Sequence, residues 1–458
     1  MSLAIPSWRG AREAGPPLLP ESATDASITA MIADPVLRGS AGRGWWIAMA
    51  CAAPLALITV IAIARLFWSG IGLFGINATV VWGIPIANYV WWIGIGNAGT
   101  LISALLLLTR QQWRASINRF AEAMTLFAVC IAGLFPILHL GRPLYFYWLA
   151  PYPNTMTLWP QWRSALVWDF WAILSYLLFS IVFFYVGLIP DLAAFRDRSV
   201  SRRGRVIYGA FALGWRGSAR QWRLHNVFYM AMAAIAVPLV CSVHSIVGLD
   251  FAASLMPGWQ ETIFPPYFVV GAMFSGFAMV VLLAAAIRWG FGFQNVLTVR
   301  HFEAMALIIL ASSLIMTLSY ATEWFSGWYG GQAAERGEIA FAFAGAYAPL
   351  FWLQLVCNCV APQILWWPRM RRNISALIAV SLAILAGMWF ERILIIWNTL
   401  SHGYLPSMRR LFVPTLEDWL LLIAPLSLFA MLFLIFLRLL PAISIHEMRQ
   451  LRHERSRP

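Results

Sequence analysis

Ionisable side chains stand within or at the ends of long apolar segments, and three of them are of particular interest. They are His139 in FPILHLGRP, Asp169 in VWDFW and Arg392 in WFERILII. Inside a membrane an ionisable group costs free energy unless it has a partner or a task. A neutral histidine and an ionised aspartate can each accept a proton from a bound substrate. His139 and Asp169 therefore favour a reaction in which a substrate gives up protons near a membrane surface.

The composition is that of an integral membrane protein. Of the 458 residues, 61% are hydrophobic and 11% are charged, and the mean hydropathy is +0.73; soluble domains are about 45–50% apolar and about 25% charged. Ten apolar runs are each long enough to cross the roughly 30 Å hydrocarbon layer, and none alternates every second residue as a barrel strand does. They are 44–68, 83–108, 120–141, 167–189, 226–249, 264–289, 302–325, 345–367, 374–397 and 418–440. The sequence therefore predicts an all-α polytopic membrane protein with ten transmembrane helices.

The positive charge is distributed as in a membrane protein and gives no support to nucleic-acid binding. The net charge is +13, and all 32 basic residues are Arg. Most of them lie in the two termini and in every second loop. The alternate loops hold only Arg142, Arg163, Arg336, Arg409 and Arg410. Because basic residues accumulate in cytoplasmic loops, we expect a cytoplasmic arm at 1–43, a membrane domain at 44–440 and a cytoplasmic basic tail at 441–458.

The cysteines predict no metal or cluster site in this chain. All five lie in the predicted spans, and no CxxC pair occurs. Cys357 and Cys359 are two residues apart, which places them about 200° apart around a helix. Zinc sites and iron–sulfur clusters need several such ligands on one side. We interpret the cysteines as small buried apolar residues.

Internal similarity divides the membrane domain into two halves. Residues 119–126 (RFAEAMTL) match residues 300–307 (RHFEAMAL) at an offset of 181. One helix earlier, at an offset of 178, the matching pairs are Tyr89 with Tyr267 and Arg110 with Arg288. Such parallel repeats are typical of duplicated membrane proteins. We predict two tandem four-helix bundles, made of spans 2–5 (83–249) and spans 6–9 (264–397), with spans 1 and 10 beside them.

The repeat separates the two halves chemically. At the offset of 181, His139 falls on Tyr320 and Asp169 falls on Leu350. Only the first half therefore bears the desolvation cost of this histidine and carboxylate. A packing role gives no reason for that asymmetry, so the difference favours a functional site in the first bundle.

The direction of the spans places these side chains at one depth. Span 3 runs outward and ends just past His139, span 4 begins just before Asp169, and Arg392 lies five residues from the outer end of span 9. At about 1.5 Å per residue, all three lie roughly 3–8 Å below the outer interface. Aromatic residues, Trp68 and Trp171 among them, gather in the same layer. A quinol that loses two electrons and two protons needs an acceptor at each hydroxyl and flat walls for its ring, so we predict a quinol site here.

The ending FPILHLGRP, the following WDFW, the ten spans and the duplicated bundle resemble the NrfD/PsrC-like membrane subunits of the polysulfide-reductase type. The chain is similar in particular to the C subunit of bacterial alternative complex III, whose leader resembles PLLPESATDASITAMI. The resemblance implies a quinol-oxidising respiratory-chain subunit of the bacterial cytoplasmic membrane. It implies menaquinol or ubiquinol as the substrate, no haem or cluster in the chain, and proton release with proton translocation as a further step.

The same resemblance assigns residues and partners. It implies that His139 and Asp169 bind and deprotonate quinol near the periplasmic face and that Arg392 lies at the same pocket. Trp68 and Trp171 are the aromatic residues that we expect against the quinol ring. The implied partners are an iron–sulfur subunit with a 3Fe–4S centre, multihaem c-type cytochromes and a second NrfD-like membrane subunit.

Three other functions stay open on the residues. The layout is similar for the quinone-reactive anchor of a molybdopterin/iron–sulfur reductase, in which electrons run the other way. A di-haem cytochrome b would pair His139 with His244 and His225 with His301. Against it, His225 lies among arginines, and 19 residues, about 28 Å of helix, separate it from His244. A secondary transporter would have discontinuous midplane helices in both halves, and the segment 97–99 has no clear counterpart.

Overall fold

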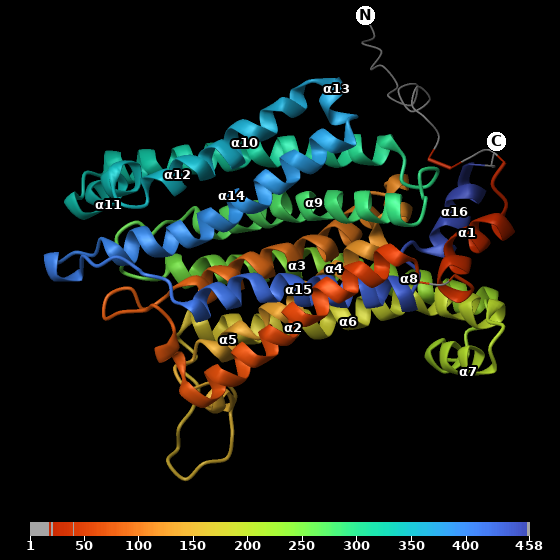
Figure 1. The fold of residues 1–458 in the computed structure, drawn as a ribbon, viewed down its shortest axis with the longest axis horizontal. Coiled ribbons are helices and arrows are strands. Elements are labelled where there is room, and N and C mark those ends of the chain that lie inside the picture. Colours follow the sequence, from red (N-terminus) through yellow and green to blue (C-terminus); the bar gives the residue numbers. More distant parts are fainter. Residues whose placement is uncertain (1–17, 20–21, 40, 456–458) are drawn as a thin grey trace, which may run out of the picture.

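The computed structural model describes residues 18–19, 22–39 and 41–455. Within them, ten helices are long and apolar enough to cross a membrane, which confirms the predicted all-helical membrane fold. The helices lie side by side, and the described parts of the two terminal segments lie at the same end (Figure 1). The spans are α2 (Arg43–Ser69), α3 (Ile84–Leu108), α4 with α5 (Asn118–Ala132 and Phe135–Leu138), α6 (Ala165–Arg198), α8 (Ala219–Ala252), α9 (Phe264–Gly290), α10 (Val299–Gly330), α12 (Ala348–Leu355) with the turns that follow it to Trp366, α14 (Ile374–Ser401) and α15 (Leu416–Leu439).

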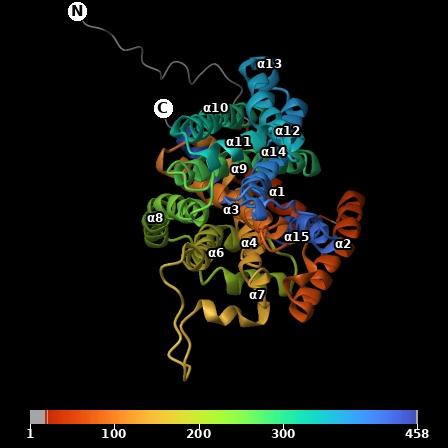
Figure 2. The ribbon, with the colours of Figure 1, turned by 90° about the vertical axis from the view of Figure 1, so that its left-hand side faces the viewer.

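Helix α3 lies at the centre of the molecule (Figure 2). Its sequence is apolar on every side, and nearly all its residues are buried against α4, α8 and α9, as expected for a helix without a polar face. Glycines allow the closest approaches. A Cβ on Gly99 would lie 2.1 Å from the carbonyl oxygen of Ala121, and a Cβ on Gly276 would lie 1.7 Å from the Ala98 side chain. Small residues thus bring α3 within contact of α4 and α9.

The remaining spans pack around this centre in neighbouring groups. Helix α6 packs on α4 and α8, and α9 packs on α3, α8, α10 and α14, with α12 against α14. Helix α2 pairs with α15 beside them. These contacts are compatible with bundles at 83–249 and 264–397, and the division into two repeated bundles stays a prediction.

Two predicted spans are interrupted. The third breaks between α4 and α5, and the chain then turns at Gly141, whose φ of +82° suits glycine. The eighth continues from α12 through a π turn (Val356–Val360) and a 3-10 turn (Ala361–Trp366). Helices α6 and α8, of 34 residues each, extend well beyond the apolar runs that predict them. Hydropathy marks only the hydrocarbon-facing part of a helix, whereas hydrogen bonding continues past it.

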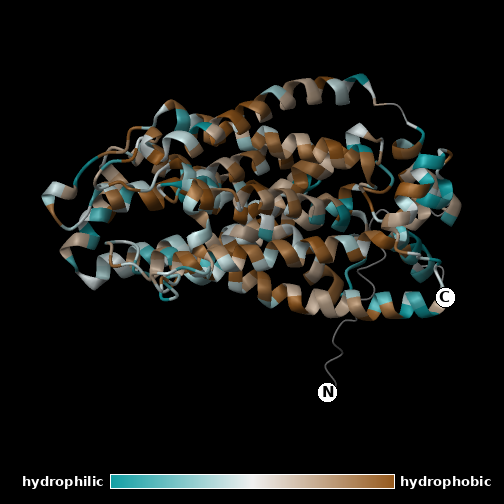
Figure 3. Cartoon of the chain, turned by 90° about the horizontal axis from the view of Figure 1, so that it is seen from below, coloured by the Kyte–Doolittle hydropathy of each residue, from teal (hydrophilic) through white to brown (hydrophobic). Residues whose placement is uncertain are grey.

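Polar structure gathers at both ends of the helices, and the middle is hydrophobic (Figure 3). At the end that holds both termini, α1 (Asp25–Leu37) begins with a capping box from Thr24 and packs on α16 (Ile445–Arg455). Asp25 forms an ion pair with Arg452, 2.6 Å between Oδ1 and Nη1. Part of the predicted N-terminal arm therefore lies against the C-terminal tail of the same chain, while residues 1–17 fall outside the described residues.

Candidate functional site

A cavity of about 260 Å³ lies at the helix ends opposite the termini. His139 is the C-cap residue of α5 and lies two residues before the turn at Gly141. Asp169 lies near the start of α6, and both side chains line the cavity. The structure therefore brings together the two residues that the sequence predicts as proton acceptors, although 30 positions separate them.

Two further polar residues line the same cavity, Tyr89 from α3 and Asp250 from the end of α8. The Tyr89 hydroxyl donates a hydrogen bond to Oδ2 of Asp169. Asp169 and Asp250 line one cavity, and two carboxyl groups that share a site cannot both ionise easily, which favours a proton on one of them. Tyr89 and Asp169 are therefore joined directly, and the Asp250 carboxyl group lies in the same cavity, where it can take up a proton.

Two carboxylate oxygens in this group are left without a partner. Oδ1 of Asp169 and Oδ1 of Asp250 are buried and make no hydrogen bond to any of the described residues. Buried polar atoms in folded proteins are nearly always hydrogen-bonded, to protein, water or a ligand. Other buried polar atoms of the described residues are unpartnered too, but these two oxygens belong to residues that line a cavity, where a ligand or water can supply donors.

Aromatic rings form the walls beside these acceptors. Trp82 lines the cavity, stacks on Trp259 at 5.4 Å between ring centroids and meets the edge of Phe251 at 5.9 Å. Phe170 lines it as well. The volume is slightly below the roughly 300–1,000 Å³ of small-molecule pockets. It therefore suits a single ring more than an elongated ligand.

The other predicted site residues lie outside this cavity. Arg392 in α14 forms an ion pair with Glu391 (2.7 Å between Nη1 and Oε1), and its guanidinium lies 4.2 Å from the centre of the Phe268 ring. Trp68, at the end of α2, is 93% exposed. Trp171 does not line the cavity, but its Nε1–H donates a hydrogen bond to the carbonyl oxygen of Leu149, which does.

Sequence reasoning missed Tyr89, Asp250 and Trp82 as cavity residues. Asp250 stands at the end of span 5 that the sequence predicts to be outward, at the depth predicted for Asp169, so the predicted depth gives a signal for it. The predicted repeat aligns Tyr89 with Tyr267, so the sequence gives Tyr89 the appearance of a packing residue common to both halves. Nothing in the sequence around Trp82 distinguishes it from the many other interfacial tryptophans.

A protein-family model described as "Polysulphide reductase, NrfD" matches residues 72–401, which include every residue of this cavity. The chain belongs to this family. It is 25% identical over 248 residues to the putative membrane C subunit of dimethyl sulfoxide reductase from Halobacterium salinarum (54% of this chain, 52% of that protein). It is 23% identical over 238 residues to the C subunit of selenate reductase from Mesobacillus selenatarsenatis (50% and 54%). The chain spans about half the length of these curated relatives. The chain is therefore related to membrane subunits of oxidoreductases.

In the second half of this NrfD-family chain, hydrogen-bonded side chains leave much less space than the cavity of the first half. Tyr320, which the predicted repeat aligns with His139, donates a hydrogen bond to Glu391 Oε2. The Asn358 amide donates to the Tyr320 hydroxyl at 3.0 Å and lies 3.3 Å from Glu391 Oε2. The cavity beside them measures only about 50 Å³. Space for a ring is therefore present in the first half and not at this place in the second.

Acidic side chains continue from this small cavity toward the helix ends opposite the termini. Glu323 and Glu338 line it, and Glu335 lies beside them around a neighbouring hollow. Burial, and then the nearby Glu335 carboxylate, raises the pKa of Glu338 in α11 (Ala333–Ala344) to about 7. Protonation of this group is therefore sensitive to pH near neutrality.

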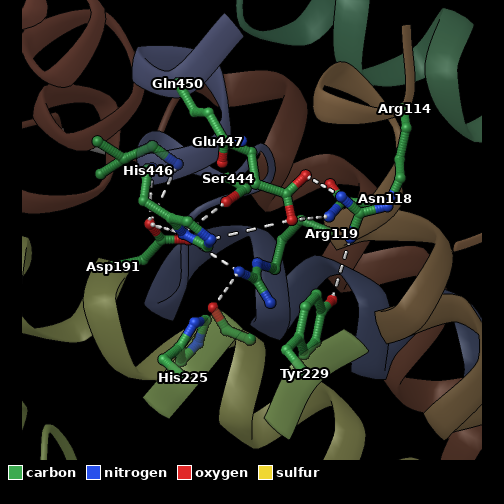
Figure 4. Close-up of polar contacts among 12 residues, drawn as sticks. Arg114, Asn118, Arg119, Asp191, His225, Tyr229, Ser444, His446, Glu447 and Gln450 are labelled. Atoms are coloured by element: carbon green, nitrogen blue, oxygen red, sulfur yellow. Dashed lines mark hydrogen bonds and ion pairs between the residues drawn. The ribbon is translucent and has the colours of Figure 1, made fainter. Parts of the chain in front are cut away.

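A second polar cluster lies at the termini end (Figure 4). Arg119 is fully buried and forms ion pairs with Glu122 (3.3 Å) and Asp191 (2.9 Å). Arg114 pairs with Glu447 of α16 at 2.6 Å. Removing one partner of such a buried pair leaves an uncompensated charge. The cluster therefore fastens the C-terminal helix to α4 and α6.

Proposed function

We propose that this NrfD-family chain binds quinol in the cavity of about 260 Å³ and oxidises it. The single observation that carries the proposal is the pair of unpartnered carboxylate oxygens, on Asp169 and Asp250, in an aromatic-walled cavity that His139 also lines. In the reaction both O–H bonds of the quinol break. Two protons pass to side chains of the cavity, two electrons leave the ring, and quinone remains.

Each residue of the cavity has a defined task in this proposal. Neutral His139 accepts the proton of one hydroxyl, and Asp169 accepts the proton of the other through its unpartnered Oδ1. Tyr89 holds Oδ2 of Asp169 and so fixes the direction of Oδ1. Asp250 shares the proton that Asp169 takes up, which frees Asp169 for the next turnover. Trp82 and Phe251 confine the ring.

The electrons pass to a separate subunit in this proposal. We expect an iron–sulfur protein with a 3Fe–4S centre at the periplasmic face, then multihaem c-type cytochromes, with a second NrfD-like subunit in the membrane. Arg142 is exposed just past the turn at Gly141 and begins the 3-10 helix Pro143–Leu149. It therefore stands beside the cavity, where an extrinsic partner can pair with it. Termini in the cytoplasm place this face outside, so protons leave to the periplasm.

Quinol oxidation by the complex in oriented vesicles tests the proposal. We expect acidification on the side of the cavity by chemistry alone, and a larger yield if protons are also translocated. Arg142→Glu is expected to weaken attachment of the iron–sulfur subunit while this chain stays folded. Arg163→Glu, at another exposed arginine of the same loop, is the matched control. Proton release only on the termini side, or a cluster protein bound at the arginine-rich end, would show that the orientation is reversed.

One observation favours a second function, which is quinone reactivity in a reductase complex. Both relatives are named as C subunits of reductases, for dimethyl sulfoxide and for selenate. In that role the same cavity binds the quinone or quinol. The direction of electron transfer then depends on whether the partner is a molybdopterin/iron–sulfur reductase or a set of cytochromes. Purification of the intact complex decides between the two functions. Haem absorbance with an iron–sulfur signal supports quinol oxidation toward cytochromes, and molybdenum without haem supports the reductase anchor.

A further inference from the structure

A second and larger hollow, of about 520 Å³, lies at the termini end, far from the quinol cavity. It is a groove between the end of α3, the 3-10 helix Gln112–Ser116, α8 and α16. Nothing in the proposed quinol chemistry uses it. Apolar side chains of the spans, Leu107 and Met230 among them, line one part, and Arg110 and Glu454 line another. The groove therefore has both an apolar wall and charged groups.

Arg110 has a backbone conformation that is unusual for arginine. Its φ is +53°, in the left-handed region that favours glycine. The residue closes α3, because the Gln111 N–H donates to the Leu106 carbonyl (2.9 Å) and the Arg110 N–H to the Leu107 carbonyl (3.1 Å). Glycine is the usual residue at this position of a helix end. The backbone thus gives no reason for an arginine here, which points to its side chain.

The repeat supplies a comparison for that side chain. Arg288, the partner of Arg110 in the second half, donates from Nη1 to the carbonyl oxygens of Gln294 (3.0 Å) and Leu297. Its turn uses glycine for the left-handed residue, Gly292, at φ +69°. The guanidinium of Arg110 makes no hydrogen bond or ion pair to any of the described residues. Arg288 therefore closes its own loop, whereas Arg110 presents its charge to the groove.

The other charged groups of the groove differ in whether they have an ion-pair partner. Arg114 and Glu447 neutralise each other, and they lie together with Gln450 in Figure 4. Glu454 is exposed, and among the described residues its carboxylate accepts a hydrogen bond from the Gln450 side-chain amide, at 2.8 Å. Of the charged side chains that line the groove, Arg110 and Glu454 are therefore the two without an ion-pair partner among the described residues. A ligand that matches both carries a negative and a positive charge.

We propose that the groove binds one phospholipid with an ethanolamine headgroup. Its phosphate contacts the Arg110 guanidinium, which matches phosphate by paired N–H donors, and its ammonium lies toward Glu454. Its acyl chains run along Leu107 and Met230, at the end of the span where the headgroup layer meets the hydrocarbon. A free phosphate shares the anion chemistry but leaves the apolar wall and Glu454 without a role.

Native mass spectrometry of the full chain in detergent, with defined lipids added, tests this site. We expect one phosphatidylethanolamine to be retained per chain, and at least tenfold less retention in Arg110→Gly. Glycine fits a φ of +53°, so this variant removes the guanidinium while the helix end is kept, and its thermal stability without lipid should match or exceed that of the parent. Arg220→Ala, at an exposed arginine of the termini end outside the groove, should retain lipid normally.

Two further arms separate the possible ligands. Glu454→Gln should abolish the preference for phosphatidylethanolamine over phosphatidylglycerol and leave phospholipid binding itself intact. Equal loss of lipid retention in Arg110→Gly and Arg220→Ala would mean that the lipid belongs to the nonspecific annular layer around the protein, and it would overturn the proposal. Displacement of the lipid by inorganic phosphate at millimolar concentration would also overturn it, since the site would then be one for a free anion.

Discussion

Replacing Asp169 with asparagine is expected to slow quinol oxidation at least tenfold in an assembled complex. The amide has the shape of the carboxylate, and its oxygen can still accept the Tyr89 hydroxyl that now bonds to Oδ2. What is lost is the proton acceptor. A positioned acid–base group contributes about 10²- to 10⁴-fold to a rate, and each tenfold step is about 1.4 kcal/mol of barrier. Because His139 and Asp250 line the same cavity and can take over part of the proton transfer, we set the lower limit at tenfold.

The assay is quinol-dependent turnover by the purified complex, with the amount of each subunit measured in the same preparation. His139→Ala should lower turnover at least tenfold as well, because it removes the acceptor at the other hydroxyl. Asp169→Glu is the informative companion, since it keeps the proton acceptor and should retain more activity than the asparagine variant. Near-normal turnover in an assembled Asp169→Asn complex would refute the assignment of this residue as an acceptor.

Two predictions concern the second half of the chain. Tyr320→Phe should lower quinol oxidation far less than His139→Ala does, but it should cost about 1–3 kcal/mol of stability because Glu391 loses a buried donor; a quinone resolved among α9, α10, α12 and α14, with none in the first half, would contradict it. Glu338→Gln should flatten the pH dependence of thermal unfolding. Because its folded pKa of about 7 lies above the unfolded value of about 4.3, the folded chain holds the proton longer and stability falls as the pH rises through this window, by at most about 3 kcal/mol. Parallel melting curves of parent and variant between pH 5 and 8 would contradict this reasoning.

The membrane fold can be predicted from the sequence because each span depends on the hydropathy of contiguous residues. Each span needs about 20 apolar positions, and hydropathy finds all ten. The ends of α6 and α8 are harder to predict, because polar side chains outside the hydrocarbon continue the same backbone hydrogen bonds. The break between α4 and α5 leaves no sign in hydropathy either. It nevertheless determines where His139 points, since this residue caps the short helix after the break.

The candidate site is only partly visible in the sequence, because its members come from four helices. His139 and Asp169 stand out as ionisable residues in apolar surroundings. Tyr89 does not, and its importance rests on a hydrogen bond to a residue 80 positions away. The sequence predicts Arg392 at the same depth as these residues, yet its guanidinium pairs with Glu391 and it does not line the cavity. Depth along the membrane normal can be counted from sequence, whereas position within the membrane plane depends on how the helices pack.

The contrast between the two halves gives a physical account of why one of them holds a cavity. In the second half, Tyr320, Glu391, Asn358 and Arg392 bond to one another, and only about 50 Å³ remains beside them. In the first half, carboxylate oxygens of Asp169 and Asp250 are left without partners beside a space about five times as large. Buried polar groups either satisfy each other or need a ligand or water. Unpartnered polar atoms occur in both halves, since Glu391 Oε1 and Asn358 Oδ1 are buried without a hydrogen bond to the described residues as well. The halves differ in space, and the acceptors of the first half are the ones beside a cavity that a quinol ring can enter.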